Sequence, residues 1–253
     1  MAHQFKKRFG QNFLRDQNLL KKIVQTAKIK DKHVIEIGPG EGGLTKHAIR
    51  EAKVLVAYEI DTTLQPTLSL LEQSASNVSF IYEDFLSIPT VDTKYTHIIG
   101  NIPYNITSPI LFKVLALDHI ERATFMVQKE FAERMTAKPK TKAYNALSVM
   151  MQLSFHASYE FTVTKKVFYP VPKVDSAIVS LQRKDVSNNE LNQFVKDCFK
   201  QKRKTLTNNL HETRNVAKET ISEALLSIGY VENARAEEVK PSDFANLYNK
   251  TLT

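Results

Sequence analysis

The sequence predicts an α/β fold, in which a mostly parallel sheet is covered by helices on both faces, followed by a small all-helical domain. Two observations lead to this expectation. Between residues 16 and 129, short apolar runs typical of buried strands alternate with segments whose apolar residues recur at helical spacing. After Arg183 the chain becomes polar and keeps only the helical spacing. We therefore expect a first domain over residues 1–184 and a helical domain over residues 185–253.

Local patterns predict each element of the first domain. Asp16 suits the N-cap of a helix that runs to Lys28, because apolar residues in this stretch recur at helical spacing. Buried strands are expected over His33–Ile37, Lys53–Tyr58, Val78–Tyr82, Thr96–Gly100 and Ala123–Val127. Helices are expected over Leu44–Ala52, Leu64–Glu72, Pro109–Leu117 and from Lys129 onward.

The pattern changes after Tyr159. Phe161–Thr164 and Val174–Leu181 are expected to form two strands joined by a proline-rich loop, which would add an antiparallel pair to the edge of the sheet. The helical domain should then contain helices over Leu191–Phe199, Lys218–Ile228 and Pro241–Tyr248.

Composition narrows the class of protein. The longest apolar runs are too short to span a membrane, and the N-terminus lacks the apolar core of a secretory signal. The single cysteine, Cys198, has no partner for an internal disulfide, which fits the reducing cytoplasm. The histidines lack the spacing of metal ligands, so no metal is expected.

The charge distribution favours a polyanionic partner. The net charge is +8 and the pI is about 9.3. Basic residues cluster at Lys6–Arg8 and again at Lys200, Lys202, Arg203 and Lys204. Such clusters are typical of proteins that bind RNA or DNA, although a single cluster can also be a solvated surface.

A glycine-rich turn follows the first expected strand. Four of the seven glycines lie between positions 38 and 43. Glycines between a strand and a helix form the nucleotide-binding turn of Rossmann-like folds, because they let the backbone approach the ligand. An acidic residue about twenty positions later should end the next strand and bind ribose hydroxyls, and Glu59 fits this position.

The residues around this turn favour S-adenosylmethionine as the cofactor. Glu36 stands two positions before Gly38, which resembles methyltransferases that use this cofactor more than dehydrogenases. Asp84 follows the third strand, where its carboxylate would accept a hydrogen bond from the adenine amine of the cofactor. Gly38, Glu59, Asp84 and Asn101 follow four successive strands, and open α/β sheets bind ligands at that edge.

The fourth strand leads into Asn101-Ile-Pro-Tyr104. An adenine N6 amine is a poor nucleophile because its lone pair is delocalised into the ring. The side-chain oxygen of Asn101 and the carbonyl of Ile102 would hold its hydrogens, so that the lone pair points at the methyl group to be transferred. Pro103 would stiffen the loop and Tyr104 would stack on the base. The alternative is an ordinary turn in which Tyr104 only packs.

Two further segments are candidates for the site. Phe168, in Phe-Tyr-Pro-Val-Pro, would face the base from its other side, or else pack in the core beside a proline-rich linker. Asn12 and the backbone of Leu14 would close over the cofactor, although residue type alone would make this segment an ordinary loop.

The order of these motifs resembles that of the KsgA-type rRNA adenine dimethyltransferases. The resemblance extends from about Arg8 to Pro241 and rests on RFGQNFL, EIGPGEG, NIPYNITSPI, MVQKE, KAYNALSVM, FYPVPKVDSA and KQKRKTLTNNL. It implies a Rossmann-like class I methyltransferase domain with a small helical C-terminal domain. It also implies transfer of two methyl groups to N6 of each of two adjacent adenines in the 3′-terminal hairpin of small-subunit rRNA.

The resemblance also assigns residues and a partner. It implies that the cofactor is bound through Asn12, Leu14, Gly38, Glu59, Asp84 and Asn101. Asn101 would hold the target amine, while Tyr104 and Phe168 match the aromatic residues that contact the base. The implied partner is the small ribosomal subunit, with Lys200, Lys202, Arg203 and Lys204 as RNA contacts, and the chain is expected to act as a monomer.

Three alternatives remain open at this point. The Erm branch, which methylates one adenine of large-subunit rRNA, also carries Asn-Ile-Pro-Tyr, whereas the KsgA branch more often has Leu at position 102. MVQKE, KAYNALSVM and KQKRKT favour the KsgA branch. A second alternative is a factor that mainly binds subunits during assembly, and a third is a DNA adenine methyltransferase, against which Ile102 argues.

Overall fold

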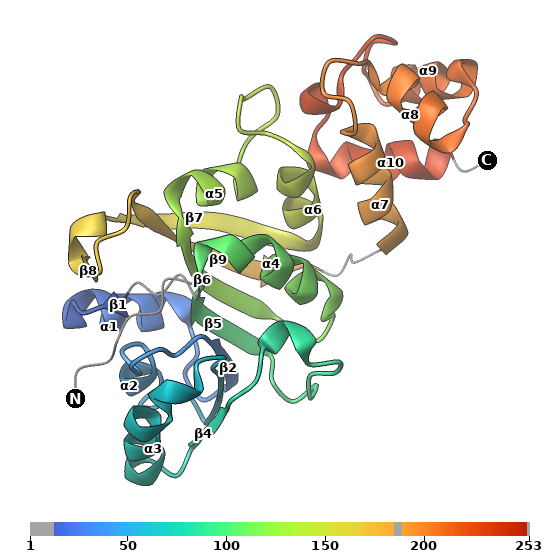
Figure 1. Ribbon diagram of the computed structural model, residues 1–253. Helices are drawn as coiled ribbons and strands as arrows, with labels where there is room; N and C mark the ends of the chain where they lie inside the picture. The colour runs from blue at the N-terminus through green and yellow to red at the C-terminus, as the bar shows by residue number, and fades with distance from the viewer. Residues whose placement is uncertain (1–12, 185–188, 252–253) are drawn as a thin grey trace. The chain divides into compact units, whose positions relative to one another are not determined.

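The computed structural model describes residues 13–184 and 189–251, which form two compact units (Figure 1). Within the described residues, the first unit comprises positions 13–132 and 158–183. The second comprises positions 133–157, 184 and 189–251. No helix in the described parts of the chain is long and apolar enough to cross a membrane.

The described strands of the main sheet are arranged in the order β4-β3-β2-β5-β6-β9-β7. Their bounds are β2 His33–Ile37, β3 Val54–Tyr58, β4 Val78–Ile81, β5 His97–Asn101, β6 Arg122–Gln128, β7 Phe155–Val163 and β9 Ser176–Arg183. The strands from β4 to β6 are parallel, and β9 pairs antiparallel with β6. Both α/β character and a mostly parallel sheet are therefore confirmed.

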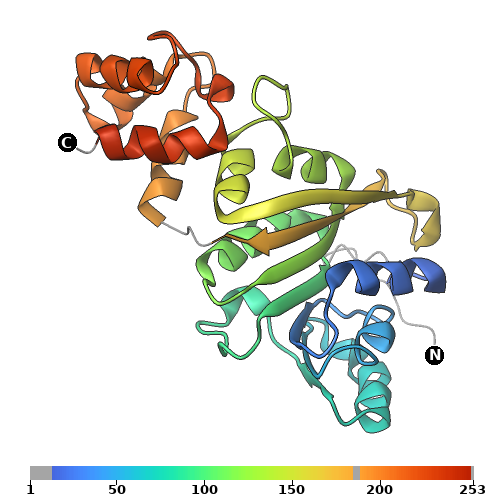
Figure 2. The same cartoon turned by 180° about the vertical axis from the view of Figure 1, so that it is seen from behind.

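Helices cover both faces of this sheet. Helix α4 lies in front of the strands in Figure 1, whereas α1 lies in front of them in Figure 2. The helices are α1 Gln17–Ala27, α2 Thr45–Ala48, α3 Gln65–Ser74, α4 Thr107–Ala116 and α5 Lys129–Met135. The short 3₁₀ turns are η2 Thr62–Leu64, η3 Phe85–Ser87, η4 Tyr104–Ile106 and η5 Lys165–Val167.

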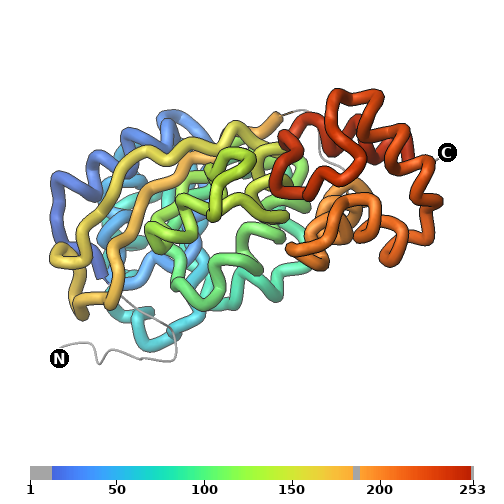
Figure 3. Tube along the Cα trace, turned by 90° about the horizontal axis from the view of Figure 1, so that it is seen from above, coloured from blue at the N-terminus to red at the C-terminus, as the bar shows by residue number. Residues whose placement is uncertain are grey.

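The predicted edge pair is present. In Figure 3, β7 and β9 run side by side, in agreement with the order of the sheet. Strand β7 begins at Phe155, earlier than expected. The loop between the two strands contains β8 Phe168–Tyr169, which pairs antiparallel with β1 Phe13–Leu14.

One helix of the first unit is shorter than predicted. A helix was expected over Leu44–Ala52, but α2 covers Thr45–Ala48. The side-chain amide of Asn77 donates to the carbonyls of Ile49 and Ala52, at 2.9 Å each. These bonds satisfy backbone acceptors at the end of the helix, so the chain can turn into β3.

The second unit is helical. Its elements are α6 Ala146–Ser154, α7 Asn189–Cys198, α8 Leu206–Arg214, α9 Lys218–Ser227, η6 Ala236–Glu238 and α10 Pro241–Thr251. Helices α6 and α8 were not predicted. The side chain of Asn145 caps α6, and that of Thr205 caps α8.

The border of the second unit differs from the predicted boundary at residue 184, because residues 133–157 belong with the C-terminal helices. The fully buried hydroxyl of Tyr144 donates a hydrogen bond of 2.7 Å to the carbonyl of Val239. The Tyr144 ring meets the edge of Phe199, which in turn stacks on Phe244. An internal segment therefore completes the core of the C-terminal helices.

We expect Tyr144→Phe to lower the free energy of unfolding of the second unit by about 1–2 kcal/mol, because the buried Val239 carbonyl would lose its partner. Urea denaturation of the full chain, followed by hydrogen exchange at α10, measures this change. Tyr159→Phe is the matched control, because its hydroxyl bonds to Thr162 at the surface. Equal stability of Tyr144→Phe and wild type would contradict the prediction.

Candidate active site

The carboxyl ends of four parallel strands surround one cavity of about 370 Å³. Gly38 follows β2, Glu59 follows β3, Asp84 lies just beyond β4, and Asn101 ends β5. All four residues line the cavity. The sheet therefore brings together residues that are far apart in the sequence, at the edge where open α/β sheets bind ligands.

The glycine turn forms one wall of the cavity. Gly38 and Gly40 have φ angles of +69° and +58°, which L-residues with side chains rarely adopt. A Cβ atom on Gly40 would lie 2.6 Å from the ring of Phe13. Glycine at position 40 thus lets the N-terminal segment pack onto the turn, and Leu14 enters the lining of the cavity beside it.

Glu59 ties this turn to the end of β3. Its two carboxylate oxygens accept hydrogen bonds from the N–H groups of Gly40, at 3.0 Å, and Asp61, at 2.9 Å. Burial raises the pKa of Glu59, and these backbone hydrogen bonds oppose the rise. The carboxylate therefore has a fixed position at the cavity wall.

Glu36 is the second buried carboxyl group of the cavity. Its side chain is 1% exposed, and neither oxygen meets a hydrogen-bond partner within the described part of the chain. Burial raises its pKa to about 8, and the nearby Thr45 hydroxyl offsets only part of that effect. A cationic group brought into the cavity would favour the ionised form of Glu36.

The Asp84 turn faces the cavity from the end of β4. The Asp84 carboxylate caps η3 by accepting from the N–H of Leu86 at 2.9 Å. The following residue, Phe85, also lines the cavity and packs edge-on against the ring of Tyr58. This turn therefore combines an acceptor with an aromatic wall.

Lys113 on α4 holds the same turn, and sequence reasoning missed it. Its ammonium group donates to the carbonyls of Phe85 and Ile88 and lies 4.6 Å from the centre of the Phe85 ring. Burial lowers its pKa. A single lysine in an amphipathic helix gives no sequence signal for this role, because the same spacing suits a solvated side chain.

The loop after β5 is held by hydrogen bonds at both ends. The N–H of Ile102 donates to the carbonyl of Met126 at 3.2 Å, and Ile102 itself is buried. The hydroxyl of Tyr104 lies 2.7 Å from that of Ser176, the first residue of β9. Tyr104 lines the cavity, so Ser176 fixes the orientation of an aromatic ring in its wall.

Phe168 does not line this cavity. Its side chain is 3% exposed and belongs to the hydrophobic core, because β8 pairs with β1 and places Phe168 opposite Leu14. The next residue, Tyr169, is 53% exposed. The structure thus favours the core position for Phe168, and its contact with a base stays a prediction. Asn12 and the Lys6–Arg8 cluster lie outside the described residues.

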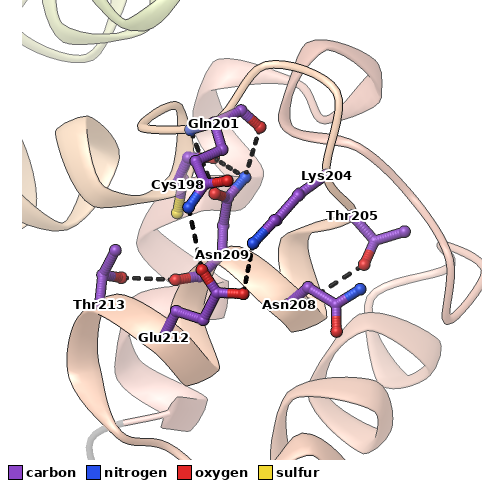
Figure 4. Close-up of polar contacts among 8 residues, drawn as sticks. All are labelled: Cys198, Gln201, Lys204, Thr205, Asn208, Asn209, Glu212 and Thr213. Carbon is purple, nitrogen blue, oxygen red and sulfur yellow. Dashed lines mark hydrogen bonds and ion pairs between the residues drawn. The ribbon is translucent and has the colours of Figure 1, made fainter.

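The basic cluster forms the turn between α7 and α8. The buried amide of Asn209 donates to the carbonyls of Cys198 and Gln201, at 3.1 Å each (Figure 4). The side-chain oxygen of Asn209 accepts from the N–H of Gln201 at 3.2 Å. One buried side chain therefore determines the path of the turn.

The four basic residues are not equivalent. Lys200, Lys202 and Arg203 are exposed, as expected for RNA contacts. Lys204 is half-buried and forms an ion pair with Glu212, whose other oxygen accepts from the side chain of Gln201. Lys204 therefore stabilises the turn, and the sequence alone gave no sign of this pairing.

Comparisons with known proteins identify the family of this chain. A model of the family described as ribosomal RNA adenine dimethylase matches residues 2–251. The chain is 45% identical over 262 residues to ribosomal RNA small subunit methyltransferase A of Aster yellows witches'-broom phytoplasma (strain AYWB), covering 98% of this chain and 96% of that protein. It is 42% identical over 258 residues to the protein of the same name from Francisella tularensis subsp. novicida, covering 96% of each.

Solved structures of similar fold include a dimethyladenosine transferase from Plasmodium falciparum. The TM-score is 0.80 at 30% identity, covering 94% of this chain and 98% of that one. The 23S rRNA methyltransferase ErmE gives a TM-score of 0.78 at 29% identity, covering 95% and 100%. Fold and site together define a class I methyltransferase.

The chain belongs to the ribosomal RNA adenine dimethylase family. The higher identity to the small-subunit methyltransferases, over nearly the full length of both chains, favours the KsgA-type branch over the Erm branch.

The raised pKa of Glu36 predicts that the fold is less stable at high pH. Its neutral form is favoured in the fold, so the stabilisation is complete below pH 4.5 and is lost as the pH rises to about 8. Between pH 4.5 and about pH 8, the contribution of Glu36 to the free energy of unfolding should fall by about 1.4 kcal/mol per pH unit. We expect Glu36→Gln to remove this slope.

Urea denaturation from pH 4 to pH 9 without cofactor measures the difference between wild type and Glu36→Gln. Glu51→Gln, which changes an exposed carboxylate, is the control and should follow wild type. Parallel pH profiles for wild type and Glu36→Gln would rule out a raised pKa at this position.

Proposed function

We propose that this chain transfers methyl groups from S-adenosylmethionine to N6 of two adjacent adenines in the 3′-terminal hairpin of small-subunit rRNA. The observation that carries the proposal is the shared cavity. The glycine turn with Glu59 and the loop from Asn101 to Tyr104 line the same cavity of about 370 Å³. A methyl donor and an adenine amine would therefore meet in one pocket. The small-subunit relatives support the choice of rRNA.

The cavity wall has the chemistry that this cofactor requires. Glu59 has fixed oxygens that would accept from ribose hydroxyls, and Asp84 would accept from the adenine amine. Phe85 and Ile60 offer apolar contact for the adenine ring, since both line the cavity. The buried carboxyl of Glu36 would become ionised beside a cationic ligand. When bound, the cofactor supplies an electrophilic methyl group on a sulfonium.

The target amine would be held by acceptors and not by a strong base. The Asn101 side-chain oxygen and the Ile102 carbonyl would accept its two hydrogens, which directs the nitrogen lone pair at the methyl carbon. The new N–C bond forms as the S–C bond breaks, and the proton then leaves to solvent. Tyr104, held by Ser176, would stack on the base once it has left its helix or loop.

Labelled S-adenosylmethionine, incubated with each ribosomal subunit from a strain lacking the modification, tests the substrate. We expect label on the small subunit, at N6 of two adjacent adenines near the 3′ end, as mapped by mass spectrometry of nuclease fragments. Label confined to the large subunit would assign the chain to Erm-type chemistry and overturn the proposal.

We expect Asn101→Ala to keep the fold and the affinity for small subunits but to lower kcat by about 10²-fold or more, because one acceptor for the amine is lost. Single-turnover methylation of small subunits measures this effect. Asn105→Ala is the matched control, since Asn105 lies four residues further on and is exposed. Methylation by Asn101→Ala at the wild-type rate would refute the proposed role of Asn101.

The basic cluster predicts that two substitutions, each of which removes one positive charge, affect the salt dependence of subunit binding unequally. Arg203→Ala should weaken subunit binding and reduce the slope of log affinity against log salt by about 1, because an exposed phosphate contact is lost. Lys204→Ala should change the slope less, because Glu212 already neutralises Lys204. Filter binding from 50 to 300 mM salt measures both slopes. Equal slopes for the two variants would show that Lys204 contacts RNA directly.

A further inference from the structure

A second surface with the character of an RNA contact lies beside the cavity. It consists of Arg15 together with the loop from Lys165 to Asp175, and we call it the rim. Figure 1 shows the part of this loop that contains β8 next to β1. Arg15 belongs to both features, because it lines the cavity and lies over the ring of Tyr169. Through Arg15 the rim thus adjoins the cavity of the proposed active site.

The rim exposes an unusual amount of apolar surface. Tyr169 is 53% exposed, Val171 60% and Val174 44%, so three large apolar side chains of one loop face solvent. The Arg15 guanidinium lies 5.0 Å from the centre of the Tyr169 ring. An exposed aromatic ring next to a planar cation is a stacking platform of the kind that binds unpaired bases.

The loop is ordered by its own hydrogen bonds. The N–H of Lys165 donates to the Asp175 carboxylate at 2.9 Å, and the N–H of Lys129 donates to the Asp175 carbonyl at 3.0 Å. The N–H of Arg15 donates to the carbonyl of Val167 at 3.5 Å. Because the loop is held in place, binding would cost little ordering entropy.

The charge of the rim is complementary to nucleic acid. Arg15, Lys166 and Lys173 are exposed, and none forms an ion pair with another residue that the structure describes. One oxygen of the Asp175 carboxylate accepts from the N–H of Lys165, and the positive charges of Arg15 and the three lysines of the loop outnumber this one negative charge. Basic side chains interleaved with an aromatic platform fit a single-stranded nucleic acid better than an apolar protein surface, because the lysines would match its phosphates.

We propose that the rim binds the unpaired RNA next to the target adenine, with a base stacked on Tyr169 and phosphates near Arg15 and Lys173. This inference rests on the proposed function and deepens it. It assigns Tyr169 to a neighbouring nucleotide and leaves the cavity to the target base. Tyr104 and Asn101 act on the reacting adenine, whereas the rim determines how the strand enters.

Tyr169→Ala tests the proposal. In steady-state methylation of unmethylated small subunits, it should raise KM about 10-fold or more and change kcat little, as expected for the loss of one stacked base. Tyr169→Phe, which keeps the ring, should restore most of the affinity. Leu70→Ala is the control, because Leu70 is 66% exposed on α3. A wild-type KM for Tyr169→Ala would overturn the proposal.

A binding measurement separates this proposal from the proposed function. Fluorescence anisotropy with a single-stranded oligoribonucleotide that carries two adjacent adenines requires no methylation. Tyr169→Ala should weaken binding about 10-fold, and Lys173→Ala should lower the salt slope by about 1, whereas Lys53→Ala, which removes an exposed lysine elsewhere, should not. If both rim variants kept the wild-type affinity and the wild-type slope of log affinity against log salt, RNA binding by the rim would be refuted even if wild type methylates small subunits. Weakened binding would support it even if methylation maps elsewhere.

Discussion

The buried carboxylate of Glu59 is the contact on which the rest of the site depends. It accepts hydrogen bonds from Gly40 and Asp61, so it joins the glycine turn after β2 to the end of β3. Two backbone donors compensate for its burial, which an ionised group otherwise resists. The turn it holds supports Phe13, and Phe13 brings Leu14 to the cavity. One buried side chain therefore connects three parts of the cavity wall: the glycine turn, the end of β3 and the segment of Phe13 and Leu14.

A second set of contacts connects the wall at β4 to the loop at β5. Lys113 lies on the helix that follows Tyr104, yet its ammonium group binds the carbonyls of the turn that carries Asp84. Ser176 supports Tyr104 from the antiparallel strand β9. Helix α4 thus connects the turn of Asp84 to the loop from Asn101 to Tyr104, and β9, which lies next to the edge strand β7, holds a side chain in the cavity wall.

Much of the fold could be predicted from the sequence, because buried parallel strands leave unbroken apolar runs. The bounds of β2 were predicted to the residue, and the glycine turn, Glu59, Asp84 and Asn101 were correctly expected at one edge. Contacts between distant polar residues were not predictable. Lys113, a single cation in a mostly apolar helix, and Asn209, in a polar helix, both look like surface residues, and their roles depend on carbonyls that no local pattern reveals. Phe168 and Tyr169 are adjacent in the chain, and the register of the pairing between β8 and β1 determines which of the two side chains is buried.

The pairing of β1 with β8 also bears on how the enzyme is made. Phe13 and Tyr169 face each other across a ladder of two residues, although more than 150 positions separate them in the chain. Such a distant contact forms after the local elements and is among the first to open, because loop closure costs entropy and the ladder is short. During translation Phe13 and Leu14 therefore lack their partner strand until β8 has left the ribosome. Strands β2 to β6 have been synthesised before that point, whereas β9 follows β8 and brings Ser176 to Tyr104.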